Sequence, residues 1–384
     1  MRVLTVVPLP PGPIGGIEDY AFGVVHGLRR RADVDVLAPA EPQSRSSDES
    51  VGNTRGLHLV PARWIFRRLL PTGAEARSRV EACVRQAEVV HLHMPCPRLE
   101  AWTAIAALRH EVPLITTYHM DAIYDGGKVD ARPGPTGRVL DWLYDSMSAR
   151  RALSRAEVIV TNSLQYARES RLLPAFLDKV RPIHQGVNLD HTTFAGGNDG
   201  VRNSLLRDAS HLVTFLGRLV PYKGIHFLIE AAARLYDEPI TFAIAGKGPL
   251  IEKLEVEVDR RGLRDRVQFL GYIPDEAISG LLQASDVVVC PSISLAESTP
   301  IVLLEALACG TPTVGTRLGG SAETLPDDGI RGRLVDPRDA AALAVAIREI
   351  LRSNPWRPNR PPLWTRTWDD VAGDYLSLYE EVLS

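Results

Sequence analysis

Cysteine is scarce in this sequence, and its four copies form no recognisable site. Cys83, Cys96, Cys290 and Cys309 have neither metal-ligand nor redox-motif spacing, so we expect reduced thiols in a cytoplasmic protein. An excess of one charge is also missing. The formal net charge is -3, which gives no reason to expect nucleic acid as a partner. No apolar run approaches the length of a membrane-spanning helix, and the N-terminus begins in a strand pattern without a signal peptide.

Short apolar strands alternate with helical segments along the whole chain, which predicts an α/β fold with parallel sheets. The 384 residues suffice for two domains. Linker-like composition at 190–200 and 353–363 separates them. We expect an N-terminal domain of residues 1–190 plus 365–384 and a C-terminal domain of residues 191–364, with a last helix at about 367–383 crossing back to the first. The expected strands are 2–7, 34–38, 57–60, 88–93, 113–118 and 157–161, then 212–217, 240–245, 266–270, 286–290 and 312–315.

The segment from Glu297 to Gly310 combines the pattern of a buried helix with two carboxylates. An expected helix at 300–309 is apolar on every side, with Pro300 in its first turn and Thr299 as its cap. Glu305 lies in its middle, where a carboxylate is costly unless a polar group meets it. Because a helix N-terminus attracts anions and carboxylates bind hydroxyls, the segment predicts a sugar-nucleotide site. The alternative is a solvated Glu297 and a Glu305 that makes a structural hydrogen bond.

Polar and glycine-rich turns follow the other strands of the second domain. Ligands bind outside the carboxyl ends of the strands in open α/β sheets. Arg218 and Lys223 follow strand 212–217, and we expect Lys223 at a helix N-terminus, where an anion would relieve the conflict with the helix dipole. The turn Gly246-Lys247-Gly248-Pro249 follows the next strand, and Gly271-Tyr272-Ile273-Pro274 follows strand 266–270, with a backbone suited to a base edge. Each is an ordinary turn alone, but together they predict a nucleotide-binding edge.

The first domain offers fewer candidates. Gly12, Gly15 and Gly16 lie at the start of an expected helix at 16–31. Their backbone N–H groups could contact a phosphate, or the glycines could form an ordinary turn into the helix. His119 follows strand 113–118 and projects toward any ligand at that strand end, although a lone histidine is as often structural. His91 and His93 are expected to line the core or a cleft. The basic amphipathic segment 63–70 suits peripheral contact with a membrane or an anionic acceptor, but we favour an ordinary packed helix.

Together these motifs resemble the retaining glycosyltransferases of family 4, which have the GT-B fold. The resemblance covers nearly the whole chain and is strongest over 212–335. The motifs that carry it in the second half are Phe215–Gly224, Ile244–Leu250, Val267–Tyr272 and the pair Glu297 and Glu305, with seven residues between them. Those in the first half are Gly15-Gly16, Tyr118–Asp121 and Val187–Asp190, and the last helix with Trp368 matches the family's crossover.

The resemblance implies two Rossmann-like domains that face each other across a cleft, and it implies roles for individual residues. Arg218 and Lys223 would hold the donor diphosphate, Glu297 the sugar hydroxyls and Glu305 both ribose hydroxyls. His119 would contact the donor sugar, commonly its 6-hydroxyl. The catalytic set is therefore His119, Arg218, Lys223 and Glu297, and the donor-binding set adds Gly16, Gly246, Lys247, Tyr272, Ile273, Thr299, Ile301, Val302 and Glu305.

One departure from the family pattern concerns Pro300. Many members have an aromatic residue and glycine after the first glutamate, whereas this chain has Ser298-Thr299-Pro300. Proline has no N–H to donate, so the amides that meet the sugar would come from Ile301 and Val302 or from residues before Pro300.

The expected activity is transfer of a glycosyl group from a nucleoside diphosphate sugar to an acceptor hydroxyl, with retention of configuration. We expect no cofactor and no metal, with UDP as the first choice of nucleotide and GDP as the second, and a monomer or homodimer. The alternatives are a sugar phosphorylase, a nucleotide-sugar epimerase or a pseudo-glycosidic coupling enzyme on the same fold, and a non-catalytic sugar-nucleotide-binding module. The sequence leaves the acceptor, the sugar and the base open.

Overall fold

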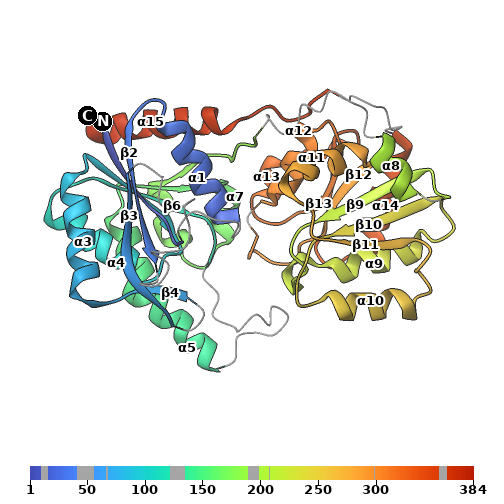
Figure 1. Ribbon diagram of the computed structural model, residues 1–384, viewed down its shortest axis with the longest axis horizontal. Helices are drawn as coiled ribbons and strands as arrows, with labels where there is room; N and C mark the ends of the chain where they lie inside the picture. Colours follow the sequence, from blue (N-terminus) through green and yellow to red (C-terminus); the bar gives the residue numbers. More distant parts are fainter. Residues whose placement is uncertain are drawn as a thin grey trace. The chain divides into compact units, whose positions relative to one another are not determined.

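The computed structural model describes residues 1–9, 16–40, 56–65, 68–121, 135–188, 199–206, 208–297, 299–353 and 361–384. The chain divides into two compact units. The first comprises residues up to Gly186 together with Trp368–Ser384, and the second comprises Val187–Thr367. Each unit has one sheet with helices on both faces (Figure 1).

The sheet of the first unit has the strand order β4-β3-β2-β1-β5-β6-β7-β8. All neighbouring strands are parallel except β3 and β4, which are antiparallel. The strands are β1 (Arg2–Val6), β2 (Asp33–Ala40), β3 (Leu57–Ile65), β4 (Arg68–Pro71), β5 (Val89–Met94), β6 (Leu114–Tyr118), β7 (Val158–Thr161) and β8 (Val180–Pro182). The helices are α1 (Gly16–Leu28), α3 (Gly73–Gln86), α4 (Leu99–Arg109), α5 (Pro135–Tyr144), α6 (Arg150–Arg155), α7 (Leu164–Glu169) and α15 (Trp368–Leu383).

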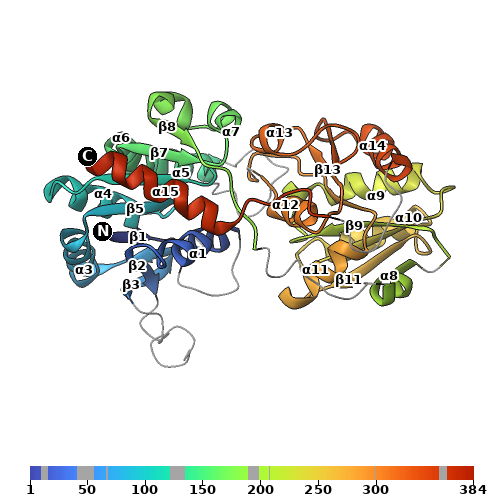
Figure 2. The ribbon, with the colours of Figure 1, turned by 90° about the horizontal axis from the view of Figure 1, so that it is seen from above.

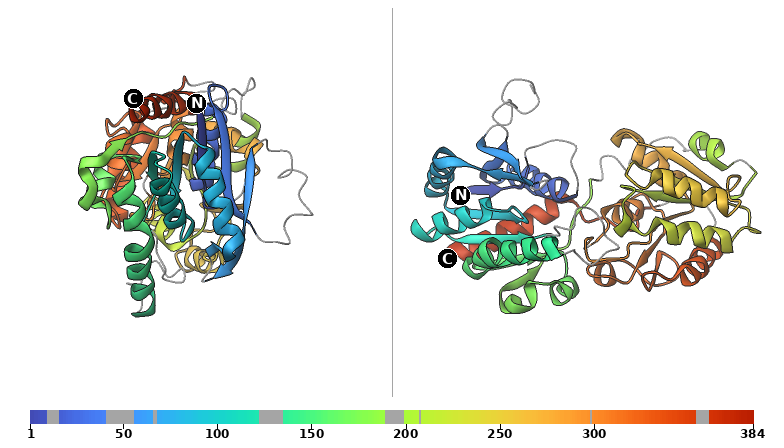
Figure 3. Two further views of the ribbon diagram at one scale, coloured as in Figure 1. Left: turned by 90° about the vertical axis from the view of Figure 1, so that its left-hand side faces the viewer. Right: turned by 90° about the horizontal axis from the view of Figure 1, so that it is seen from below.

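The C-terminal helix α15 is part of the first unit although it follows the whole second unit in sequence. It packs along α1, as Figure 2 shows, and both chain termini lie on this unit (Figure 3). Its apolar and aromatic face enters the same core as α1 and the sheet, which explains why a helix of this composition returns. The residues that α15 buries are Val371, Ala372, Tyr375, Leu378 and Tyr379.

The sheet of the second unit is entirely parallel, with the order β11-β10-β9-β12-β13-β14. Its strands are β9 (His211–Leu216), β10 (Ile240–Ala245), β11 (Val267–Gly271), β12 (Val287–Cys290), β13 (Thr313–Thr316) and β14 (Gly332–Val335). Its helices are α8 (Asp199–Leu206), α9 (Ile225–Arg234), α10 (Ile251–Arg260), α11 (Asp275–Ala284), α12 (Ile301–Ala308), α13 (Ser321–Thr324) and α14 (Ala340–Ser353).

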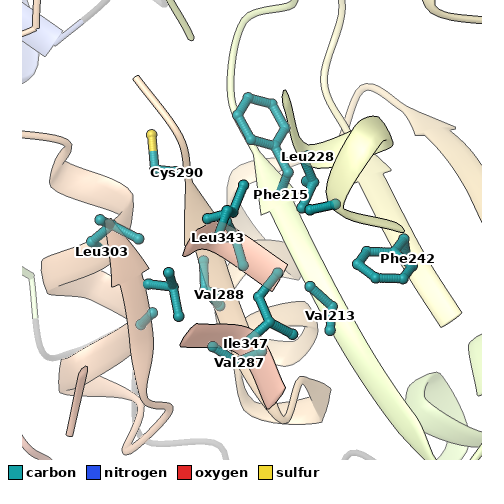
Figure 4. Close-up of a cluster of buried hydrophobic side chains, with 14 of the residues drawn as sticks. Val213, Phe215, Leu228, Phe242, Val287, Val288, Cys290, Leu303, Leu343 and Ile347 are labelled. Atoms are coloured by element: carbon teal, nitrogen blue, oxygen red, sulfur yellow. The ribbon is translucent and has the colours of Figure 1, made fainter. Parts of the chain in front are cut away.

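The core of the second unit fixes its central strands. Val213 of β9 pairs with Val287 of β12, and both belong to one core cluster with Phe215 and with Leu343 and Ile347 of α14 (Figure 4). Strands buried on both faces read as continuous apolar runs, which is why this sheet was visible in the sequence. The packing holds the ends of β9 and β12 side by side, and the candidate site begins there.

Several predictions differ from the structure. Segment 63–70 does not form a helix: Arg63 to Ile65 end β3, Arg68 to Leu70 begin β4, and residues 66 and 67 lie outside the described residues. A π-helical turn at Asp145–Ala149 joins α5 to α6. Strands β8 and β14 were not predicted. Most of the two expected linkers, at 189–198 and 354–360, lies outside the described residues.

No helix in the described part of the chain is both long and apolar enough to cross a membrane.

Candidate active site

The loops that leave β9, β10 and β11 are bonded to one another at the carboxyl edge of the second sheet. The Gly217 N–H donates to the Ala245 carbonyl at 3.1 Å, and the Gly246 N–H donates to the Gly271 carbonyl at 2.6 Å. Gly246 has φ +128°, and a Cβ there would lie 1.8 Å from the Gly217 carbonyl oxygen. Only glycine permits this approach. Gly246 is therefore needed for the close contact between the loops after β9 and β10.

Lys223 ends a short 3-10 turn, Pro221–Lys223, and immediately precedes Gly224, the N-cap of α9, so it lies next to the N-terminus of that helix as predicted. Gly224 separates it from the helix with φ +66°, and a Cβ on Gly224 would lie 2.0 Å from the Pro291 carbonyl oxygen. The Ile293 N–H also donates to the Tyr222 carbonyl at 2.8 Å. These contacts hold the loop after β9 against the loop after β12.

That contact brings Lys223 to Glu297, which is the central feature of the site. The Lys223 ammonium forms an ion pair with the Glu297 carboxylate, and the two side chains are only 11% and 13% exposed. Burial lowers the pKa of Lys223, but the adjacent carboxylate outweighs it, so the pKa is raised above its usual value. Lys223 is therefore a cation at physiological pH. The sequence had placed these two residues on different parts of a ligand and had not predicted their direct pairing.

Two residues that the sequence analysis did not select complete the surroundings of Glu297. The Ser292 hydroxyl donates to Glu297 Oε2, and the Cys290 thiol lies 3.7 Å from the same oxygen. Ser292 is fixed in turn, because the Thr316 hydroxyl donates to its carbonyl at 2.7 Å. Burial, together with the charge of Glu297, raises the pKa of Cys290 to about 12. The Cys290 thiol therefore stays protonated and is unsuited to act as a nucleophile.

The other two cations that the sequence predicted for this site, Arg218 and Lys247, are more open to solvent. Arg218, two residues after the end of β9, is exposed. Lys247 is also exposed, and its ammonium lies 5.5 Å from the ring centroid of Tyr272, which is 59% exposed. Ile273 is partly buried beside it. These side chains follow three neighbouring strands, β9, β10 and β11, so the structure confirms that the turns share one sheet edge.

The helix after Glu297 begins one residue later than predicted. Pro300, not Thr299, is the N-cap of α12, and its own side chain makes no capping hydrogen bond. Thr299 is buried. The amides of Ile301 and Val302 fall in the first turn, where a helix supplies no acceptor of its own. The apolar residues of α12 after Ile301 are buried as predicted. Glu305 is only partly buried and does have interaction partners, so the structure does not place it as a fully buried carboxylate.

The candidates of the first unit lie in a different setting. Gly16 begins α1 and is exposed, while Gly12 and Gly15 lie outside the described residues. His119 directly follows β6 and is only 6% exposed. Its Nε2 lies 2.9 Å from Nδ1 of His93, on the neighbouring strand β5. Burial lowers the pKa of His119 to about 3, so its imidazole is neutral at physiological pH.

His91 belongs to a second buried network in the same unit. Tyr379 of α15 bonds its Nδ1 at 2.7 Å, and Thr117 of β6 bonds its Nε2 at 2.7 Å. The Thr117 hydroxyl is also hydrogen-bonded to the Tyr375 hydroxyl at 2.7 Å. The Tyr375 hydroxyl is in turn hydrogen-bonded to that of Tyr20 of α1 at 3.1 Å. The network ties the returning helix to the sheet beside His119. A histidine pair two residues apart on a strand, which puts both rings on one face, was the signal in the sequence.

No cluster of three or more histidine, cysteine, aspartate or glutamate residues that could hold a metal ion is found within the described ranges.

Comparison with known proteins gives matches over both halves of the chain. Residues 14–191 match the family model described as Glycosyltransferase Family 4, and residues 201–360 match Glycosyl transferases group 1. A D-inositol 3-phosphate glycosyltransferase from Geodermatophilus obscurus is 31% identical over 97% of this chain and 86% of its own length. A phosphatidyl-myo-inositol mannosyltransferase from Mycobacterium leprae is 27% identical over 100% of this chain and 97% of its own.

Solved structures agree with the sequence matches at the level of the fold. Anabaena Alr3699/HepE, solved in complex with UDP, superposes with a TM-score of 0.71 at 20% identity, over 100% of this chain and 97% of that one. Sucrose-phosphate synthase from Thermosynechococcus elongatus gives 0.67 at 20% identity, over 100% and 96%. The chain therefore has the GT-B fold and belongs to the family 4 glycosyltransferases.

Proposed function

We propose that the enzyme transfers a glycosyl group from a nucleoside diphosphate sugar to an acceptor hydroxyl, with retention of configuration. The observation that carries the proposal is the Lys223–Glu297 ion pair, which lies near the start of α12 at the carboxyl edge of the sheet. A cation, a carboxylate and free helix amides at one strand end suit a ligand that has both phosphates and hydroxyls.

The cations would stabilise the leaving group. Departure of the nucleoside diphosphate places negative charge on its phosphate oxygens, and preorganised cations lower the cost of that charge. Lys223 has three N–H donors, and Glu297 occupies only part of this capacity, so a phosphate can bind beside the carboxylate. Arg218 would add a planar fork from the end of β9. In this proposal the two side chains take the place that a divalent metal holds in metal-dependent transferases.

The acids and the backbone would hold the rest of the donor. Glu297, fixed by Ser292 and Lys223, would accept hydrogen bonds from sugar hydroxyls near the reacting carbon. Glu305 would accept from the ribose hydroxyls, and the turn at Tyr272 and Ile273 would hold the base. The sugar would also meet the amides of Ile301 and Val302 and, from the first unit, the neutral His119. Gly16, Gly246, Lys247 and Thr299 remain predicted donor-binding residues.

The relatives suggest which acceptors to test first. The names of two relatives give inositol phosphate and phosphatidylinositol as acceptors, so we propose a hydroxyl of a cyclic polyol phosphate as the acceptor here. UDP and GDP both remain candidates for the nucleotide, because recognition of the base by backbone groups would leave little trace in the side chains.

The test is an assay of purified protein with UDP-, GDP- and ADP-sugars against inositol phosphates and phosphatidylinositol. We expect one donor to yield a product whose anomeric configuration, read by proton NMR, equals that of the donor. An inverted product would refute retention. Phosphate-dependent cleavage or epimerised donor would indicate the alternative enzymes, and nucleotide binding without turnover would favour the binding module.

A further inference from the structure

Two buried histidine rings meet at the carboxyl edge of the first sheet. His93 of β5 and His119 after β6 lie with their planes only 13° apart, and Nδ1 of His93 is 2.9 Å from Nε2 of His119. The His119 ring is held from other sides as well. Its backbone N–H donates to the Met94 carbonyl at 3.1 Å, and the Tyr20 ring packs edge-on at 4.9 Å between centroids. The geometry of the pair is therefore fixed.

Both rings are neutral, so a single proton lies between them. Burial lowers the pKa of His119 to about 3, and burial together with the neighbouring histidines lowers the pKa of His93 well below its usual value. Either His93 Nδ1–H donates to His119 Nε2, or His119 Nε2–H donates to His93 Nδ1. The two arrangements differ in what the outer nitrogen of His119 presents: an N–H in the first case, and a lone pair in the second.

The outer nitrogen of His93 distinguishes the two arrangements. Nε2 of His93 is completely buried and has no hydrogen-bond partner among the residues that the structure describes. In the second arrangement this atom would carry a proton with no acceptor, and buried N–H groups without an acceptor are rare in native proteins. In the first arrangement it carries only a lone pair. His91 differs, because both of its ring nitrogens are bonded.

We propose that His93 is a positioning residue that donates from Nδ1 to His119 and so holds His119 in the Nδ1–H tautomer, ready to donate to an oxygen of the ligand. The identity of that oxygen, a hydroxyl or phosphate of the donor, rests on the proposed function. The tautomer itself does not. Among the described residues no hydrogen bond from His119 Nδ1 is found, and in this proposal that N–H is the group that meets the ligand.

The tautomer is measured directly by long-range proton–nitrogen correlation NMR on protein labelled with ¹⁵N-histidine, without substrate. We expect His119 to carry its proton on Nδ1, opposite to the Nε2–H form that free neutral histidine favours. A proton on Nε2 of His119 in the wild-type protein would overturn the proposal. The ten histidines are assigned by variants, with exposed His26→Leu as the control that leaves the His119 signals unchanged.

Activity provides the second readout. Asn places an amide donor near the position of Nδ1, whereas Leu fills similar volume without a donor. We expect His93→Asn to keep kcat/KM within about threefold of wild type and His93→Leu to lose roughly tenfold, as for one lost hydrogen bond. A folded His93→Leu with wild-type activity and an unchanged His119 tautomer would refute the role. Inactivity of the wild-type protein with every donor would refute the proposed function and leave the tautomer result standing.

Discussion

The three buried histidines of the first unit make its stability depend on pH in a predictable direction. Burial lowers the pKa values of His91 and His119 to about 3 and that of His93 well below its usual value. In the unfolded chain each histidine would have a pKa of about 6.5. Between these values the unfolded state binds more protons than the folded state, so stability is fully present above pH 6.5 and is lost as pH falls.

The size of the effect follows from the number of protons. At pH 5.5, one unit below the unfolded pKa, keeping one histidine neutral costs about 1.4 kcal/mol. Three histidines lower the stability of the unit by about 4 kcal/mol relative to pH 7.5, on the same reasoning. The protonation of carboxylates changes little over this range, because their pKa values in the unfolded chain are about 4.

Hydrogen exchange by mass spectrometry measures this loss locally. Peptides that cover β5 and β6 report on the first unit, and peptides from β12 and β13 serve as the internal reference, after correction for the intrinsic exchange rate at each pH. We expect protection in β5 and β6 to fall between pH 7.5 and 5.5 more than in the reference. His93→Leu removes one of the three histidines that folding keeps neutral. Its loss of protection in β5 and β6 between pH 7.5 and 5.5 should therefore be about a third smaller than that of the wild-type protein. Equal slopes in the two units, or an unchanged slope in His93→Leu, would refute the reasoning.

Three further predictions concern single contacts, each read as a change in the free energy of unfolding. Ser292→Ala removes a donor to Glu297 and should cost about 1.5 kcal/mol and lower turnover. Ser294→Ala in the same loop removes only an acceptor for the Ala296 N–H and should have a smaller effect on both; equal effects would contradict the role of Ser292. Gly246→Ala should cost at least about 3 kcal/mol, because its Cβ would meet the Gly217 carbonyl oxygen, whereas Gly262→Ala, with φ +67° and open space, should cost only about 1 to 2 kcal/mol. Tyr379→Phe should cost about 1 to 3 kcal/mol by leaving His91 Nδ1 buried without a partner, and the exposed Tyr236→Phe should change stability by less than about 0.5 kcal/mol. A small loss in Gly246→Ala or in Tyr379→Phe would show that the surroundings relax around the change.

Much of the architecture could be predicted because buried parallel strands leave continuous apolar runs. The runs at 212–217, 240–245, 266–270, 286–290 and 312–315 all correspond to strands of the second sheet, with ends shifted by a residue or two. Segment 63–70 failed because its strands depend on each other. Arg63 pairs with Leu70 and Ile65 pairs with Arg68, and a hairpin this short has too few residues to reveal its period.

The ion pair could not be predicted because it depends on the order of strands in space. Lys223 and Glu297 are 74 residues apart, and two strands, β10 and β11, lie between β9 and β12 in sequence. In the sheet, β9 and β12 are neighbours, so the loops after them meet. Opposite charges after two strands were visible, but the adjacency of those strands was not. The same reasoning applies to Ser292, which has no feature of its own until Glu297 lies beside it.

The histidine pair shows a different limit. The spacing of His91 and His93 placed both rings on one face of a strand, but only the packing of β6 and α15 shows that one ring has both nitrogens bonded and the other has one. Burial at this level cannot be inferred from a pattern of polar residues, since exposed strands show the same pattern.

The most direct test of the central claim is calorimetric titration of UDP and GDP into the wild-type protein and into Lys223→Met. The claim is that Lys223, held by Glu297, binds the diphosphate. We expect one of the two nucleotides to bind the wild-type protein and to bind Lys223→Met at least about tenfold more weakly, a loss of about 1.4 kcal/mol. Exposed Lys253→Met, on α10, is the control that keeps wild-type affinity. Equal affinity in Lys223→Met and wild type, or no binding of either nucleotide to the wild-type protein, would contradict the account.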